Sequence, residues 1–254
     1  MARRDDVNKL YIWPSRIEYI IKWLFWINIT CSVTSCLFKT DTVSNSLLVV
    51  QILVSILYVV SRIIDDNFFW YNAEKARRQT AIENGFGIDI TEFKTNEYYN
   101  NSLPNNSIKF SVNAFESIMF SKETAGRMLC KESIRMGIIV LAFISSCLVN
   151  RDYRIVLIIS QIVFSAYFVE EYVVLAIYKS RLEKLYDDFY KQSITIGIKA
   201  EDQISLLLAY AIEYEAIKAH YKVRLSEKEF WKHNTETSLK WKQVHRKIKS
   251  RLTF

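Results

Sequence analysis

Glycine and proline, the residues that most often end a helix, are scarce in this chain of 254 residues, which has 5 glycines and 2 prolines. Both prolines, Pro14 and Pro104, lie outside the long apolar runs. Long stretches of the chain therefore lack helix breakers. The sequence predicts an all-α fold.

Cysteine is also sparse, at Cys31, Cys36, Cys130 and Cys147. None forms a CxxC pair or has a histidine at ligand spacing, which argues against a zinc site. We expect the four cysteines to pack as small apolar side chains. Cys36 and Cys147 both lie near the outer ends of predicted helices, which permits a disulfide without supplying a geometry for one.

Familiar catalytic motifs are missing as well: the sequence has no P-loop, HExxH, GxSxG, Rossmann glycine pattern or EF-hand. Its three histidines, His220, His233 and His245, are not spaced as metal ligands. Glu170 and Glu171 are adjacent and point to different helical faces, which argues against a cooperating carboxylate pair. We therefore expect no enzyme, no metal and no cofactor.

Long apolar runs are what the chain does have. Its mean hydropathy is only +0.03, but apolar residues gather in four blocks, at residues 20–38, 47–64, 134–149 and 155–177. A helix needs roughly 20 residues to cross a hydrocarbon core of about 30 Å, and short polar links join the blocks in two pairs. This pattern predicts an integral membrane protein with four transmembrane helices in two hairpins.

Basic residues set the expected orientation. They flank the outer ends of each predicted hairpin, whereas the two short links carry only Lys39 in one case and Arg151 with Arg154 in the other. The positive-inside rule then places both termini and the central segment in the cytoplasm. We predict four parts: a first hairpin within residues 1–64, a cytoplasmic helical insert at 65–133, a second hairpin at 134–178, and a cytoplasmic helical region at 179–254.

The cytoplasmic parts are expected to extend the membrane helices. The helix that follows residue 64 should continue to a break at Gly85 and Gly87, and a turn-rich loop at 98–106 either connects or binds a partner. The last fifteen residues predict a basic amphipathic helix. It could dock on anionic lipid, or its apolar stripe could face the protein core. Nucleic acid is less favoured because juxtamembrane positive charge already explains the net charge of +7. The candidate lipid-binding or partner-binding residues are Lys75, Arg77, Arg78, Lys240, Lys242, Arg246 and Lys247.

Polar side chains align along single faces of the predicted spans. They either line a water-permeable path when several copies assemble, or they form ordinary hydrogen bonds between packed helices. A bundle of four helices is too narrow for a large pore, so the first interpretation needs a homo-oligomer. The candidate path residues are Asn28, Ser32, Ser35, Gln51, Ser55, Tyr58, Gln161, Ser165 and Glu170.

The segment at 73–87, AEKARRQTAIENGFG, is a basic, glutamine-containing helix followed by an aromatic-glycine turn. With the predicted topology, it resembles bacterial antiphage membrane effectors of the SMODS-associated four-transmembrane effector type. That resemblance implies an inner-membrane protein that oligomerises or opens and depolarises the cell when triggered. The implied trigger is a sensor protein or a nucleotide second messenger acting on the cytoplasmic helices. The competing hypothesis is a non-toxic membrane scaffold or regulator whose cytoplasmic helices bind a partner.

Overall fold

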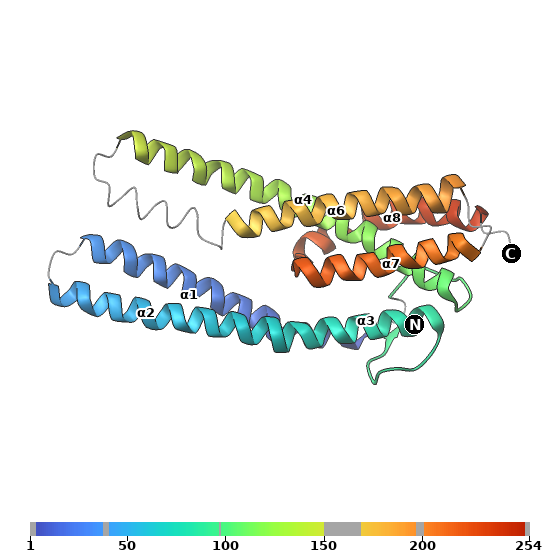
Figure 1. Ribbon diagram of the computed structural model, residues 1–254, viewed down its shortest axis with the longest axis horizontal. Coiled ribbons are helices and arrows are strands. Elements are labelled where there is room, and N and C mark those ends of the chain that lie inside the picture. The colour runs from blue at the N-terminus through green and yellow to red at the C-terminus, as the bar shows by residue number, and fades with distance from the viewer. Residues whose placement is uncertain (1–3, 38–40, 97, 150–168, 197–200, 252–254) are drawn as a thin grey trace.

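The computed structural model describes residues 4–37, 41–96, 98–149, 169–196 and 201–251 (Figure 1). Nearly all of this is helical, which confirms the all-α prediction. The strands in the described ranges are β1 (Arg4–Asp5) and β2 (Thr95–Asn96), which pair antiparallel. This short ribbon fastens the amino-terminal segment beside the loop that follows residue 87.

The first half of the chain forms a long arm. Its elements are η1 (Asp6–Tyr11), α1 (Ile12–Leu37), α2 (Asp41–Ile64), η2 (Asp65–Phe69) and α3 (Trp70–Phe86). α1 and α2 pack as a hairpin, while α2, the π-helical turn η2 and α3 form one continuous rod (Figure 1). Gly87 ends the rod in the left-handed conformation at φ 68, and its N–H donates to the Glu83 carbonyl at 2.8 Å. The predicted end of the helix is confirmed at Gly87, whereas Gly85 lies inside α3. We call these elements the hairpin arm.

The second half forms a packed bundle. Its elements are α4 (Ser107–Val149), α6 (Glu171–Tyr190), η4 (Lys191–Ile196), α7 (Glu201–Tyr221) and α8 (Glu227–Arg251). We call these elements, without the exposed second half of α4, the bundle. Its centre is aromatic: Phe115 stacks on Phe189 with ring centroids 4.4 Å apart, and Trp241 meets Phe115 edge-on at 5.8 Å. All three side chains are fully buried, so the carboxyl-terminal helix belongs to the core.

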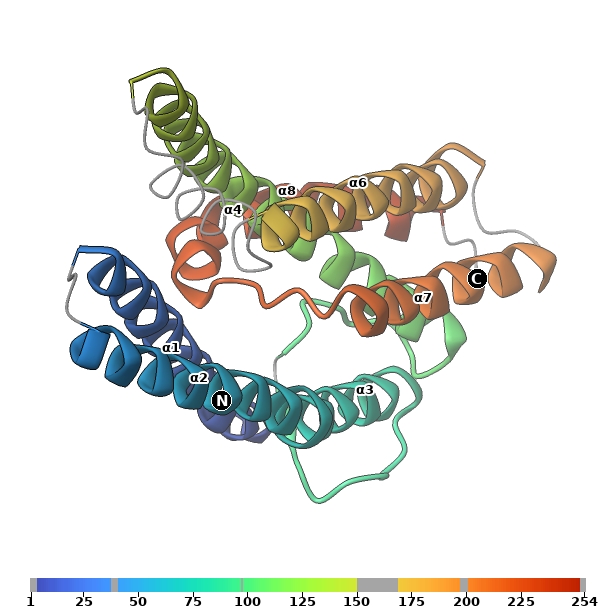
Figure 2. The same ribbon diagram turned by 60° about the vertical axis from the view of Figure 1, so that its left-hand side comes forward.

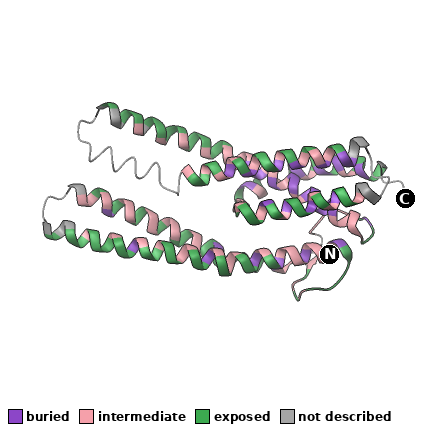
Figure 3. Cartoon of the chain, viewed as in Figure 1, coloured by how far each residue is buried: buried purple, intermediate pink, exposed green. Residues whose placement is uncertain are grey.

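Many large apolar side chains elsewhere are exposed (Figure 3). They cover α1, α2 and the second half of α4, where Leu53 is 56% exposed and Leu141 65% exposed. Within the described ranges one helix, Asn45–Phe86, is long and apolar enough to cross a membrane. Its most apolar 18-residue window has a mean hydropathy of 2.4, and 6% of that window is buried. Four spans stay a prediction, and the predicted fourth span at 155–177 lies mostly outside the described residues.

The hairpin arm and the bundle meet chiefly where α3 packs on α4. At the far end of α3, Phe86 stacks on Phe110 with ring centroids 5.6 Å apart. Gly85 lies against the same residue so closely that an added Cβ would sit 2.6 Å from the Phe110 Cβ. Glycine is therefore required at this contact, because any larger residue would push the two helices apart.

Candidate functional site

The polar stripes of the first hairpin face each other. Asn28 donates from Nδ2 to Ser55 Oγ at 2.6 Å, and Gln51 donates from Nε2 to Asn28 Oδ1 at 3.1 Å. Tyr58 accepts a hydrogen bond from Arg62 Nη1 at 3.4 Å. In this conformation, these stripe residues bond to neighbouring side chains, as packed membrane helices commonly do, and a water-permeable path along them stays a prediction.

The remaining path residues have varied surroundings. Ser32 and Ser35 are half-buried, and the Ser35 hydroxyl has no hydrogen-bond partner within the described part of the chain. Glu170 is exposed at the start of α6, whereas Gln161 and Ser165 lie outside the described residues. The side chains of Cys36 and Cys147 are likewise outside the description, while Cys31 is buried and Cys130 exposed, both as free thiols.

The predicted basic helix at the carboxyl terminus is α8, and its apolar stripe faces the core. Trp241, Val244 and Ile248 are all buried. Of the two arrangements expected for that stripe, docking on lipid or packing in the protein core, the structure shows packing in the core. Lys242 and Arg246 are exposed, Lys240 pairs with Glu236 at 3.0 Å, and Lys247 donates to the Tyr190 hydroxyl at 3.4 Å. The helix runs away from the exposed apolar ends of α1, α2 and α4 (Figure 1).

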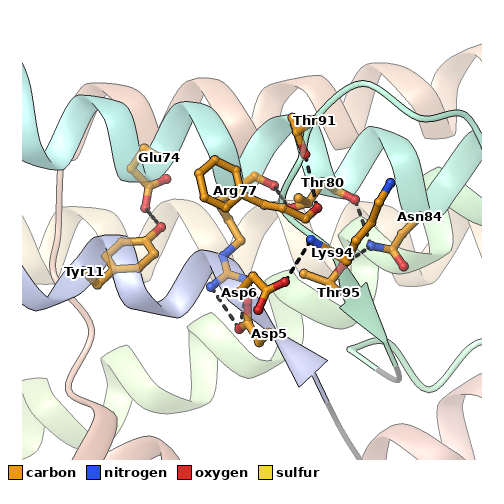
Figure 4. A network of polar contacts seen from close by, with 11 residues as sticks. Asp5, Asp6, Tyr11, Glu74, Arg77, Thr80, Asn84, Thr91, Lys94 and Thr95 are labelled. Atoms are coloured by element: carbon orange, nitrogen blue, oxygen red, sulfur yellow. Dashed lines mark hydrogen bonds and ion pairs between the residues drawn. The ribbon is translucent and has the colours of Figure 1, made fainter.

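The basic residues on α3 divide into two kinds. Lys75 is exposed and Arg78 half-buried. Arg77 instead turns toward the amino-terminal segment, where its two terminal nitrogens grip Asp5 at 3.0 to 3.1 Å (Figure 4). Its guanidinium also lies over the Tyr98 ring, 4.8 Å from the centroid. A planar cation with a bidentate carboxylate and an aromatic face is held firmly in place.

A half-buried lysine joins α7 to α3. Lys218 lies 3.5 Å from Glu74 and 3.1 Å from Glu215, and its ammonium is 5.2 Å from the centre of the Tyr214 ring. Burial alone lowers the pKa of Lys218, but the two carboxylates raise it above its ordinary value, so the lysine stays charged. Glu74 also accepts a hydrogen bond from the Tyr11 hydroxyl at 2.7 Å (Figure 4). One carboxylate on the rod thus holds both the amino-terminal segment and the bundle.

Arg224 makes a second bridge, from the segment between α7 and α8 to the hairpin arm. It lies 2.6 Å from Asp65 and 3.2 Å from Asp66, with Glu18 at 3.9 Å. Its guanidinium also covers the Trp70 ring at 4.7 Å from the centroid. Asp65 is completely buried, and Arg224 is its cationic partner in the described structure. We call Asp5, Arg77, Glu74, Lys218, Asp65, Asp66 and Arg224 the charged seam.

Two adjoining cavities lie along the charged seam. One has a volume of about 980 Å³ and the other about 580 Å³, which is the size range of small-molecule sites. Cationic, aromatic and hydroxyl side chains and one leucine contribute to both walls: Arg77, Tyr98, Ser121, Tyr214, Lys218 and Leu225. The Ser121 and Tyr214 hydroxyls share a buried hydrogen bond of 2.8 Å. Arg77, Lys218 and Arg224 in this space already have carboxylate partners, so an anionic ligand would have to compete with those carboxylates.

Sequence reasoning missed the charged seam, although part of its signal is visible. Asp65 and Asp66 directly follow the most apolar run in the chain, where an unpaired charge is costly, so a cationic partner could have been sought. The partner's identity was not readable, because Arg224 lies in a linker far along the chain. Within the described residues no group of three or more His, Cys, Asp and Glu could hold a metal ion. No family model, no curated protein and no solved structure matches the chain.

Proposed function

We propose that this chain is a multi-pass membrane effector that permeabilises the inner membrane when its cytoplasmic bundle is triggered. The observation that supports it is the division of the chain into an apolar hairpin region with exposed side chains and a packed bundle, connected by the charged seam. Exposed apolar helices of this kind require an apolar medium. The antiphage role, the homo-oligomer and the sensor or second-messenger trigger belong to this proposal through the resemblance described above.

The conformation described is then the closed one. The polar side chains of the first hairpin bond one another, so a conducting path needs them to separate or to meet a second copy. The amino-terminal ribbon and the far end of α8 both lie at the packed end of the molecule (Figure 1), which suits two cytoplasmic termini.

The test is membrane potential and propidium uptake in bacteria after induced expression, with and without the genomic neighbour as the trigger. A Gln51→Leu/Gln161→Leu double variant and a surface variant outside the candidate sites, Arg181→Ala, serve as comparisons. We expect the native chain and Arg181→Ala to depolarise the cell and the double variant to lose the effect. An intact potential in every triggered culture would refute the effector function.

A second candidate function is favoured by one observation. The hydrogen bonds among Asn28, Gln51 and Ser55 are what a hairpin that merely anchors a cytoplasmic bundle would also form. A membrane scaffold of this type would be harmless when overproduced, and the Gln51→Leu variant would leave its partner binding unchanged. Cell viability after induction therefore separates the two functions.

A further inference from the structure

The linker between α7 and α8 takes a strained path toward the hairpin arm. α7 ends at Tyr221, and the next residue, Lys222, has the left-handed φ of 49 and donates its N–H to the Lys218 carbonyl at 3.0 Å. A side chain larger than glycine rarely adopts this conformation, and such strain persists only where surrounding contacts hold it. Figure 2 shows this linker as an extended stretch between α7 and α8. Two residues after Lys222, Arg224 forms ion pairs with Asp65 and Asp66 of the arm. The turn at Lys222 directs the linker toward the arm, where Arg224 makes its contacts.

The far side of this contact is unusual as well. Asp65 and Asp66 begin the π-helical turn η2, at the point where the rod leaves its apolar window. π-helical turns inside α-helices recur at functional sites. Without Arg224, the fully buried carboxylate of Asp65 would lack its cation and would stand beside a second carboxylate. Both effects favour protonation or hydration of Asp65, and separation of the arm from the bundle would admit the water.

The opposite end of the same rod is fixed by packing. The close approach of Gly85 to Phe110 joins α3 to α4 near the packed end of the molecule. Asp65 lies about 30 Å away along the rod, so a rotation of about 10° at Gly85 would move Asp65 by about 5 Å. The intervening space holds the cavity of about 980 Å³ and is bridged by long charged side chains. The rod is therefore attached to the bundle by packing at Gly85 and by ion pairs at Asp65 and Asp66, so it can rotate about the packed end when the ion pairs break.

We propose that Arg224 is a latch that holds the hairpin arm closed against the bundle, with the Gly85–Phe110 contact as its hinge. Breaking the Arg224 contacts with Asp65 and Asp66 swings the apolar hairpin away from the bundle. The ion pair between Lys218 and Glu74 lies between the Arg224 contacts and the Gly85–Phe110 contact, and it breaks later in the same movement. As a control of membrane opening the latch rests on the proposed function, but the movement itself can be measured without it.

Pulsed electron spin resonance on the full chain in lipid nanodiscs tests the latch. Spin labels replace the exposed residues Lys75 on α3 and Lys228 on α8, in a background whose native cysteines are alanines. We expect Arg224→Gln to shift the main distance to longer values, and Asp66→Asn to give a smaller shift in the same direction. Arg224→Lys keeps the positive charge and should largely retain the closed distance.

The matched control is Arg181→Gln, because Arg181 is exposed on α6 and has no ion pair among the described residues. It should leave the distance unchanged. An unchanged distance in folded Arg224→Gln and Asp66→Asn proteins would overturn the latch, even if the protein depolarises cells. A longer distance without depolarisation would instead support the latch and count against the effector function.

Discussion

The two halves of α4 use the same kinds of residue in opposite surroundings. In the first half Val112, Phe115 and Ile118 are buried inside the bundle, whereas in the second half Ile138 and Leu141 are exposed. One continuous helix thus passes from a region that supplies its own apolar interior to a region that has none. The difference indicates that the second region depends on its solvent, and under the proposed function that solvent is lipid.

The largest expected difference between the packed and the exposed region comes from replacing one leucine in each region with alanine. Leu182 in α6 is 0% exposed and Leu141 in α4 is 65% exposed. We expect Leu182→Ala to lower the free energy of unfolding of the bundle by about 2–5 kcal/mol through lost burial and a residual cavity. Leu141→Ala should change it by less than about 0.5 kcal/mol. Denaturant titration in detergent, followed by near-ultraviolet circular dichroism, measures both. Equal costs would contradict the division.

The next effect concerns charge at exposed isoleucines. Ile56 on α2 is 54% exposed and Ile212 on α7 is 60% exposed, so their accessibility is alike while their proposed surroundings differ. Ile56→Lys should oppose membrane insertion by about 2.5–3.5 kcal/mol, because a lysine would face the bilayer centre. Ile212→Lys should insert normally. Alkaline extraction of membranes followed by immunoblotting gives the inserted fraction. Normal insertion of the Ile56→Lys chain would argue against lipid at that face.

A smaller effect is expected inside the first hairpin. Asn28→Leu removes the acceptor for Gln51 and the donor for Ser55. Interhelical hydrogen bonds in membranes contribute about 0.6 kcal/mol on average, so the hairpin should lose about 1 kcal/mol. Thr30→Val is the control, since the Thr30 hydroxyl bonds only the Trp26 carbonyl of its own helix. Thermal melting in detergent micelles compares them, and an identical melting temperature for both variants would remove any role of this contact in stability.

The smallest effect is a pH dependence within the bundle. A hydrogen bond from Lys131 lowers the pKa of Glu229. The pair therefore stabilises the folded state above the unfolded glutamate pKa of about 4.3, and its contribution is lost as the pH falls through the lowered folded value. Melting between pH 7 and pH 3 should show slightly less acid sensitivity in Glu229→Gln than in the native chain. An increase in acid sensitivity would contradict the sign of this contribution.

Local features of the fold were predictable because they depend on local rules. The continuation of the helix beyond residue 64 and its end at Gly87 follow from the absence of breakers and from the left-handed conformation that glycine permits. The polar stripes on α1 and α2 could likewise be located from periodicity. Their exact pairing could not, because the register of a hairpin depends on side-chain packing that a short link does not specify.

The contacts of the charged seam join residues that are far apart in the sequence, so they could not be predicted from it. Arg224 and Asp66 lie 158 residues apart, and many other cations could have paired with that carboxylate. The surroundings of the basic tail were ambiguous for a related reason: a stripe formed by Trp241 and Ile248 suits lipid and protein equally well. Only the position of α8 in the bundle decides that the stripe faces Phe115 and its neighbours.

The most direct test of the central claim is the accessibility of single cysteines to a membrane-impermeant maleimide in intact spheroplasts. Asn45→Cys, at the tip of the first hairpin, and Lys228→Cys, at the start of α8, are made in a chain whose native cysteines are alanines. The account predicts that Asn45→Cys is labelled from outside, whereas Lys228→Cys is labelled only after the membrane is opened. Equal labelling of the two positions, or recovery of the chain in the soluble fraction, would contradict it.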